Sequence, residues 1–277
     1  MPITKVLITV KTYPTLSSKY DELVCTAGFR EDGSWIRLYP IPFRKKSYIE
    51  QYKKYDWVEV DLVKNTTDFR PESYRPFSAD SKIEVVGHID TKNNWAARKE
   101  IALKKVYESL TPLIDEAKEK NIGTSLATFK PAEIIDFKVE SVSREWDKNK
   151  LAKMRQMNLF ESASEDGHFE VVRKLPYKFS YILLDKDGKK SKMMIEDWEI
   201  GQLYWNCFGR HHGDEQKAVL DVRNKYFEDF AKTKDLYLFL GTTQAHHFVS
   251  HNPFVIIGTF HPKIDVPKIE TQMSLPF

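Results

Sequence analysis

The first 90 residues hold several short apolar segments, each separated from the next by turn residues. Residues 56–63 alternate between apolar and polar side chains, and residues 6–10 and 83–89 are similarly rich in β-branched residues. Residues 35–39 follow the turn sequence Glu-Asp-Gly-Ser at positions 31–34. Successive side chains of a strand point to opposite faces, so this alternation is typical of strands with one buried face. It predicts a small barrel or a strongly curled sheet.

The region after residue 170 combines strands and helices. A helix is expected to begin after Asp197, whose carboxylate is suited to cap it, and another is expected from about residue 214 to residue 232. Four segments have the composition of strands, and a hairpin signal, Asp-Lys-Asp-Gly, joins the first two: residues 177–184, 192–195, 236–241 and 253–260. The last two are strongly apolar, which is typical of central strands.

These patterns divide the chain into four parts. We expect an N-terminal β-rich domain over residues 1–142, with a helical segment at about residues 95–120 where apolar residues recur at helical spacing. A polar linker or loop is expected over 143–170, a C-terminal α+β domain over 171–262, and a flexible tail over 263–277. The predicted fold class is α+β, with an N-terminal β-barrel-like domain followed by a mixed α/β domain.

Composition limits the class of protein. Of the 277 residues 41% are hydrophobic and 30% are charged, and no run approaches the roughly 20 apolar residues that span a bilayer. The two cysteines, Cys25 and Cys207, show no spacing typical of a disulfide framework or of a metal site. We therefore expect a cytoplasmic protein without a membrane partner. The net charge of +3 neither requires nor excludes a nucleic-acid partner.

Two short segments share one pattern. The segment Gln156-Met157-Asn158-Leu159-Phe160 lies in the polar stretch, and Gln272-Met273-Ser274-Leu275-Pro276-Phe277 ends the printed sequence. Both resemble the peptides by which many bacterial replication and repair proteins bind the β sliding clamp, although each has Met where Leu is commonest. The resemblance implies that Gln156, Met157, Leu159, Phe160, Gln272, Met273, Leu275 and Phe277 bind the clamp. Alternatively, the apolar residues of the internal copy pack on the domain.

Basic and aromatic side chains are interleaved between Trp35 and Trp57, and two further arginines follow. On a strand, Trp35, Arg37 and Tyr39 share one face. Exposed rings and cations on a small barrel are typical of a single-stranded nucleic-acid surface, because rings stack on bases and cations follow phosphates. The candidate contacts are Trp35, Arg37, Tyr39, Arg44, Lys45, Lys46, Arg70 and Arg75. Alternatively, Trp35 and Tyr39 face a core and the lysines form an ordinary solvated face.

Six of the eight histidines follow residue 210. His211, His212, Asp214, His246 and His247 lie in segments between expected elements, where histidine and carboxylate side chains can hold a divalent metal or act as acids and bases. Their spacing matches no specific metal motif. The competing interpretation is that they lie in polar loops and make ordinary hydrogen bonds there. The sequence also lacks a glycine-rich phosphate loop, a nucleophile elbow and HExxH. A divalent metal is thus conceivable, but no cofactor is predicted.

Together these patterns favour a DNA-associated accessory protein for repair, replication or phage-related defence, recruited to the DNA sliding clamp and touching nucleic acid through the basic aromatic face. A metal-dependent nuclease or other hydrolase using the C-terminal His/Asp residues is the alternative. A non-catalytic binding module is the second alternative.

Overall fold

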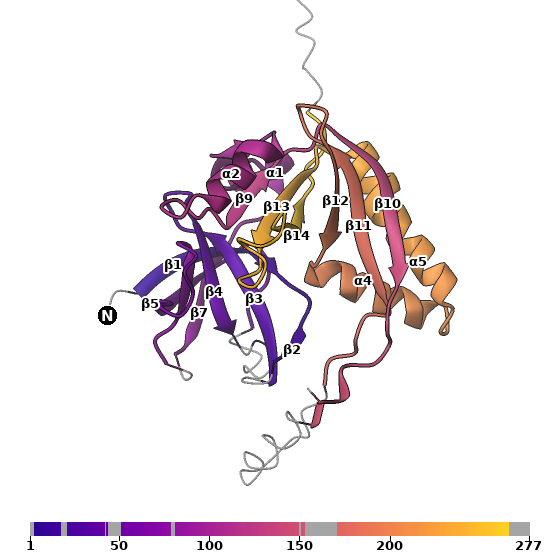
Figure 1. Ribbon diagram of the computed structural model, residues 1–277, viewed down its shortest axis with the longest axis horizontal. Coiled ribbons are helices and arrows are strands. Elements are labelled where there is room, and N and C mark those ends of the chain that lie inside the picture. Colours follow the sequence, from indigo (N-terminus) through magenta and orange to yellow (C-terminus); the bar gives the residue numbers. More distant parts are fainter. Residues whose placement is uncertain are drawn as a thin grey trace, which may run out of the picture.

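The structure is a computed structural model, and it describes residues 3–17, 21–41, 43, 51–78, 81–149, 151–152 and 171–265. Figure 1 shows a barrel and a second sheet lying side by side, with β13 and β14 between the barrel and the outer strands of that sheet. The predicted α+β class is confirmed, and the barrel precedes the mixed sheet as expected. No helix of the described residues is long and apolar enough to cross a membrane.

The barrel is closed by its first strand. Its strands are β1 (Ile3–Lys11), β2 (Thr15–Ser17), β3 (Asp21–Phe29), β4 (Trp35–Ile41), β5 (Asp56–Lys64), β6 (Ser73–Pro76) and β7 (Ile83–His88). β1 pairs antiparallel with both β3 and β5, so the order β1-β3-β4-β6-β5 returns to β1. The alternation in β5 places Val58, Val60 and Leu62 in the barrel core.

The second sheet has the strand order β10-β11-β12-β14-β13-β9-β8. Its strands are β8 (Val106–Tyr107), β9 (Leu126–Phe129), β10 (Glu133–Ser141), β11 (Tyr177–Leu184), β12 (Lys190–Ile195), β13 (Tyr237–Thr242) and β14 (Phe254–Phe260). The helical elements are α1 (Lys92–Ala102), α2 (Leu110–Lys118), α4 (Trp198–Arg210), α5 (Glu215–Arg223) and the π-helical η3 (Asn224–Ala231). Side chains from α2, α4, α5 and η3 join those of the sheet in the largest core cluster.

Two expected boundaries differ from the structure. The helical segment expected at about 95–120 is divided, because β8 separates α1 from α2. In addition, β8, β9 and β10 pair within the second sheet, whereas residues 106–142 were expected in the first domain. Apolar periodicity indicates which residues are buried. It does not indicate which of two sheets a strand joins.

The barrel and the second sheet share a core along β13 and β14. Leu7, Ala27 and Phe29 from the barrel pack with Phe239 and Phe260 from these strands. Both faces of β1 are consequently buried from Val6 to Val10. The barrel and the second sheet separate on the other side of β14, toward β12 and β11, and a cavity lies there.

Candidate functional site

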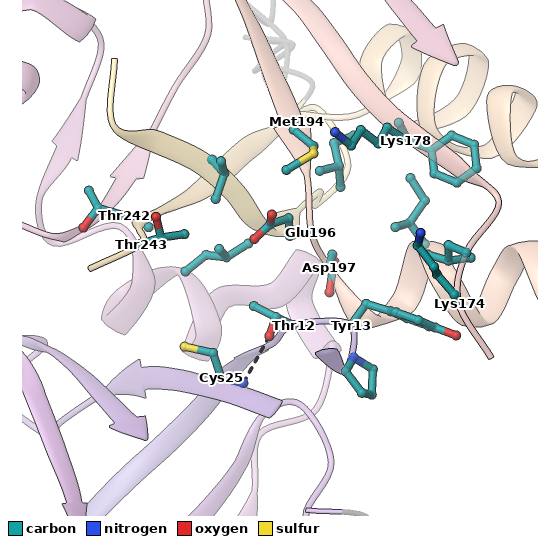
Figure 2. A pocket seen from close by; sticks show the side chains of 18 of the residues that line it. Thr12, Tyr13, Cys25, Lys174, Lys178, Met194, Glu196, Asp197, Thr242 and Thr243 are labelled. Carbon is teal, nitrogen blue, oxygen red and sulfur yellow. Dashed lines mark hydrogen bonds between the residues drawn. The ribbon is translucent and has the colours of Figure 1, made fainter. Parts of the chain in front are cut away.

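A cavity of about 480 Å³ lies between the barrel and strands β11 and β12. Such a volume is typical of small-molecule and cofactor sites, which span about 300–1,000 Å³. Figure 2 shows its side chains converging from the turn after β1, from β3, from the ends of β11 and β12, and from the segment after β13. Several of the lining residues carry polar groups: Thr12, Tyr13, Cys25, Tyr39, Lys174, Lys178, Glu196, Asp197, Thr242, Thr243 and Gln244.

Strand alternation explains which side chains of β11 and β12 reach the cavity. Met193 and Ile195 point to the helix-covered core, so Met194 points to the opposite face of β12. On β11, Phe179 likewise enters the core and Lys178 points away from it. Met194 and Lys178 therefore reach the cavity from the face of the sheet that the helices leave uncovered, whereas Phe179 and Ile195 border it from the core side.

Glu196 follows β12 at the centre of the cavity wall. Its backbone is held on both sides: its N–H donates to the Ile256 carbonyl at 2.8 Å, and its carbonyl accepts from the Tyr13 N–H at 3.0 Å. Its half-buried carboxylate makes no hydrogen bond to the described residues. Burial raises the pKa of Glu196, an effect that the positive charge of Lys178 opposes.

A second polar group of the cavity also lacks a partner. Thr243 Oγ1 is buried and makes no hydrogen bond within the described structure. Burying a hydroxyl without a partner costs about 1–3 kcal/mol, so such groups are rare and usually have a reason. Together with the Glu196 carboxylate, Thr243 gives the cavity hydrogen-bonding capacity that a polar ligand would satisfy.

Two lysines add positive charge to the cavity. Lys174 donates to the Glu145 carbonyl at 2.9 Å, which leaves two of its ammonium protons for other acceptors. Lys178 is exposed, and its ammonium makes no hydrogen bond to the described residues. Both side chains lie on the same side of Glu196 in Figure 2. They would attract an anionic group to this end of the cavity.

Asp197, next to Glu196, is structural. Its carboxylate accepts from the Lys54 ammonium at 2.8 and 3.0 Å and caps α4 by accepting from the Glu199 N–H at 3.4 Å. The Asp197 side chain is fully buried, and burial raises its pKa while the Lys54 ammonium opposes that rise. Asp197 is the N-cap of α4, as expected from the sequence.

Arg37 was expected to reach nucleic acid from an exposed strand face, and this expectation of exposure is wrong. Only 2% of the residue is exposed. Its guanidinium donates to Ser125 Oγ at 2.8 Å, to the Ser125 carbonyl at 3.2 Å and to the Thr242 carbonyl at 3.4 Å. Trp35, Arg37 and Tyr39 do share one face of β4, but that face packs against the second sheet. Arg37 thus joins the two halves.

Of the other predicted nucleic-acid contacts, Tyr39 and Arg70 line the same cavity as Arg37, whereas Trp35 and Arg75 do not line it. Trp35 is half-buried, with its ring 4.0 Å from that of Phe29, whereas Tyr39 lines the cavity. Arg70 is buried, and its guanidinium pairs with Asp68 at 2.6 Å. Arg75 is exposed and donates to the carbonyl of Pro76. Arg44, Lys45 and Lys46 lie outside the described residues.

The predicted histidine and aspartate residues occupy separate places. His211 Nε2 lies 2.8 Å from Asp221 on α5, and His212 sits in the following turn. Asp214 caps α5. His247 is buried, with Nδ1 2.8 Å from Thr242 Oγ1 and Nε2 2.7 Å from the Ala117 carbonyl, whereas His246 is exposed. Among the described residues, no group of three or more His, Cys, Asp or Glu side chains is arranged to hold a metal ion.

The proposed clamp-binding residues lie outside the described structure. Residues 153–170 contain the internal peptide, and residues 266–277 contain the second one. The resemblance to clamp-binding peptides therefore stays a prediction from the sequence. The residues that sequence reasoning missed are Thr12, Lys178 and Glu196, which are far apart in the chain. The signal available for Glu196 was a carboxylate placed directly after a strand, a common position for site residues.

Residues 106–276 match the family model described as Domain of unknown function (DUF8757). The chain belongs to the DUF8757 family. Residues 2–104 match a second model, Domain of unknown function (DUF8758). The boundary falls between α1 and β8, so the DUF8757 match covers the second sheet and its helices, and the cavity lies between the two matches. No curated protein matches the chain.

Tyr13 connects the barrel to the DUF8757 part at the edge of the cavity. Its hydroxyl donates to the Arg173 carbonyl at 2.7 Å and accepts from Trp205 Nε1 at 2.8 Å. Its ring lies against Gly201 of α4, where a Cβ atom would be 2.1 Å from a ring carbon. Glycine is required at position 201 because the ring takes the place of a side chain.

We expect Gly201→Ala to lower the free energy of unfolding by about 1–3 kcal/mol, because the methyl group must displace the Tyr13 ring. Gly209, in the same helix, has open space at its Cβ position. Gly209→Ala should therefore not destabilise the protein, since alanine favours a helix more than glycine does. Urea unfolding of both variants measures the difference. If the Gly201→Ala and Gly209→Ala variants are equally stable, the Tyr13 ring does not pack tightly against position 201.

Proposed function

We propose that the protein is a DNA-associated accessory protein that holds a nucleotide of a single strand in the cavity between the barrel and the second sheet. The observation that carries the proposal is the combination in one cavity of unpaired hydrogen-bonding groups, Glu196 and Thr243, with the free ammonium of Lys178. A nucleotide has a complementary set of groups: a base edge with donors and acceptors, and an anionic phosphate.

The aromatic walls of the cavity support this proposal. Tyr13, Tyr39, Trp146 and Tyr177 all line it. A base stacked on an aromatic side chain contributes about 1–3 kcal/mol to binding, and the interaction tolerates any base because every base has a flat face. The Glu196 carboxylate accepts from an N–H of the base, and Lys178 contacts the phosphate.

Recruitment to the sliding clamp remains part of the proposal. The clamp peptides at residues 156–160 and 272–277 would bring the cavity close to DNA, and two peptides on one chain could occupy two pockets of a clamp ring. A pull-down with a bacterial β clamp tests this. We expect Leu275→Ala plus Phe277→Ala, and Leu159→Ala plus Phe160→Ala, each to reduce retention, and the combined variant to abolish it. Equal retention of all forms would remove the clamp from the proposal.

Binding of labelled single-stranded oligonucleotides over a range of salt concentrations tests the cavity. We expect Lys178→Ala to weaken binding and to reduce the salt slope by about 0.7, the contribution of one phosphate contact in a single strand. Lys186→Ala is the control, because Lys186 lies at the opposite end of β11 and pairs with Glu108 at 2.7 Å. If both variants bind like the unmodified protein, the cavity does not hold the strand. Absence of any binding, with clamp retention intact, would favour a non-catalytic module.

A further inference from the structure

A second, smaller hollow also borders Tyr13. Its volume is about 240 Å³, and it is lined by Tyr13, Val171, Val172, Arg173, Trp198, Gln202 and Trp205. Tyr13 lines the main cavity as well, so the two hollows share this side chain as a wall. We propose that the smaller hollow holds the neighbouring nucleotide, so that the protein binds a dinucleotide unit of a single strand across Tyr13. This inference rests on the proposed function.

The shared wall is held firmly in place. The Tyr13 hydroxyl uses both its donor and its acceptor capacity, with Arg173 and Trp205 as partners. Its ring is held against Gly201. A ring fixed in this way can separate two adjacent bases without losing side-chain freedom on binding. In proteins that bind single strands, successive bases stack on aromatic side chains of this kind.

Positive charge reaches both hollows from consecutive residues. Arg173 lines the smaller hollow and Lys174 lines the main cavity. The Arg173 guanidinium lies 3.8 Å from the centroid of the Trp205 ring, which orients its planar face. The phosphate that joins two nucleotides would pass between these hollows, and Arg173 and Lys174 supply cations on either side of that passage.

The smaller hollow can also read a base edge. The side-chain amide of Gln202 lines it and makes no hydrogen bond to the described residues. An amide offers both donors and acceptors, so it can pair with the edge of any base. Trp198 supplies a further aromatic surface. This combination of cation, amide and indole rings suits a nucleotide, which offers a phosphate to Arg173, a base edge to Gln202 and a flat face to the indole rings.

Calorimetry with deoxynucleoside 5′-monophosphates and the matching dinucleotides tests the proposal. We expect a dinucleotide to bind at least about tenfold more tightly than its mononucleotide, because a second base stacks. Arg173→Ala combined with Gln202→Ala should remove most of this advantage, because it lowers dinucleotide affinity more than mononucleotide affinity. Both side chains lie at the surface of the hollow, and the Arg173 carbonyl that holds Tyr13 is retained.

The outcomes separate this inference from the function on which it rests. If mononucleotides and dinucleotides bind with equal affinity, the main cavity holds a nucleotide and the second subsite is wrong. If the double variant keeps the dinucleotide advantage, the second base lies elsewhere and the inference also fails. If neither ligand binds, the proposed function itself is overturned. Thermal unfolding of the double variant, expected to stay cooperative with only a small loss from the Arg173–Trp205 contact, excludes loss of the fold as the cause.

Discussion

Replacing Arg37 with alanine is expected to lower the free energy of unfolding by roughly 2–5 kcal/mol. The buried guanidinium donates to Ser73, Ser125 and Thr242, so it connects β4 and β6 to the segment before β9 and to the end of β13. Its removal leaves a void and takes the donor from the Ser125 carbonyl. Arg37→Lys should lose less, because an ammonium retains the charge but cannot reach all of these acceptors.

Arg75→Ala is the matched control for Arg37→Ala. Arg75 is an exposed arginine on neighbouring β6, so its replacement should change stability by no more than about 0.5 kcal/mol. Urea unfolding followed by far-UV circular dichroism measures all three variants. Unchanged stability of Arg37→Ala, together with a reduced salt slope for DNA binding, would contradict the buried role. It would return Arg37 to the solvent-facing role that the sequence suggested.

Replacing Asp197 with alanine is expected to cost about 3–5 kcal/mol, the usual effect of removing one partner from a buried ion pair. The Asp197 and Lys54 side chains are 0% and 8% exposed, so the Lys54 ammonium would keep only Glu199 as a charged partner. Asp197→Asn should cost less than Asp197→Ala, because the amide oxygen can still cap α4 and the side-chain volume is kept.

Asp214 offers a control with the same helix-capping role. Its carboxylate caps α5 by accepting from the Lys217 N–H at 3.1 Å, but its side chain is 36% exposed and it pairs with an exposed lysine. Asp214→Ala should therefore cost only about 1 kcal/mol. Chemical unfolding of the two alanine variants separates the stability that the buried ion pair contributes from the stability that helix capping contributes. Equal losses would mean that the Lys54 contact adds no stability.

The fold was predictable where a single strand or helix carries its own signal. The alternation in β5 and the β-branched residues of β1 were enough to predict a barrel, and the capping preference of aspartate was enough to place the start of α4 at Asp197. The assignment of residues 106–142 to a domain was not predictable in this way. These strands find their partners in β11 and β13, which lie far along the chain.

The candidate site was predictable only in part, and β4 shows why. Alternation correctly places Trp35, Arg37 and Tyr39 on one face, but a local pattern cannot show that a second sheet covers that face. Because both faces of β4 are buried, the face expected to bind nucleic acid instead forms the interface between the barrel and the second sheet. Similarly, the cavity depends on Glu196 and Lys178 meeting Thr12 and Cys25 from the barrel, and no spacing in the sequence indicates such a meeting.

Cys25 provides the most direct test of the central claim that the cavity holds a single strand. Its thiol is free and lines the cavity, whereas Cys207 is buried and can serve as an internal reference. The measurement is the rate of Cys25 alkylation, followed by mass spectrometry, with and without a saturating single-stranded oligonucleotide. We predict that the oligonucleotide slows the reaction at least about tenfold, because the occupied cavity blocks access to the thiol. An unchanged alkylation rate under conditions where the oligonucleotide is bound would contradict the claim.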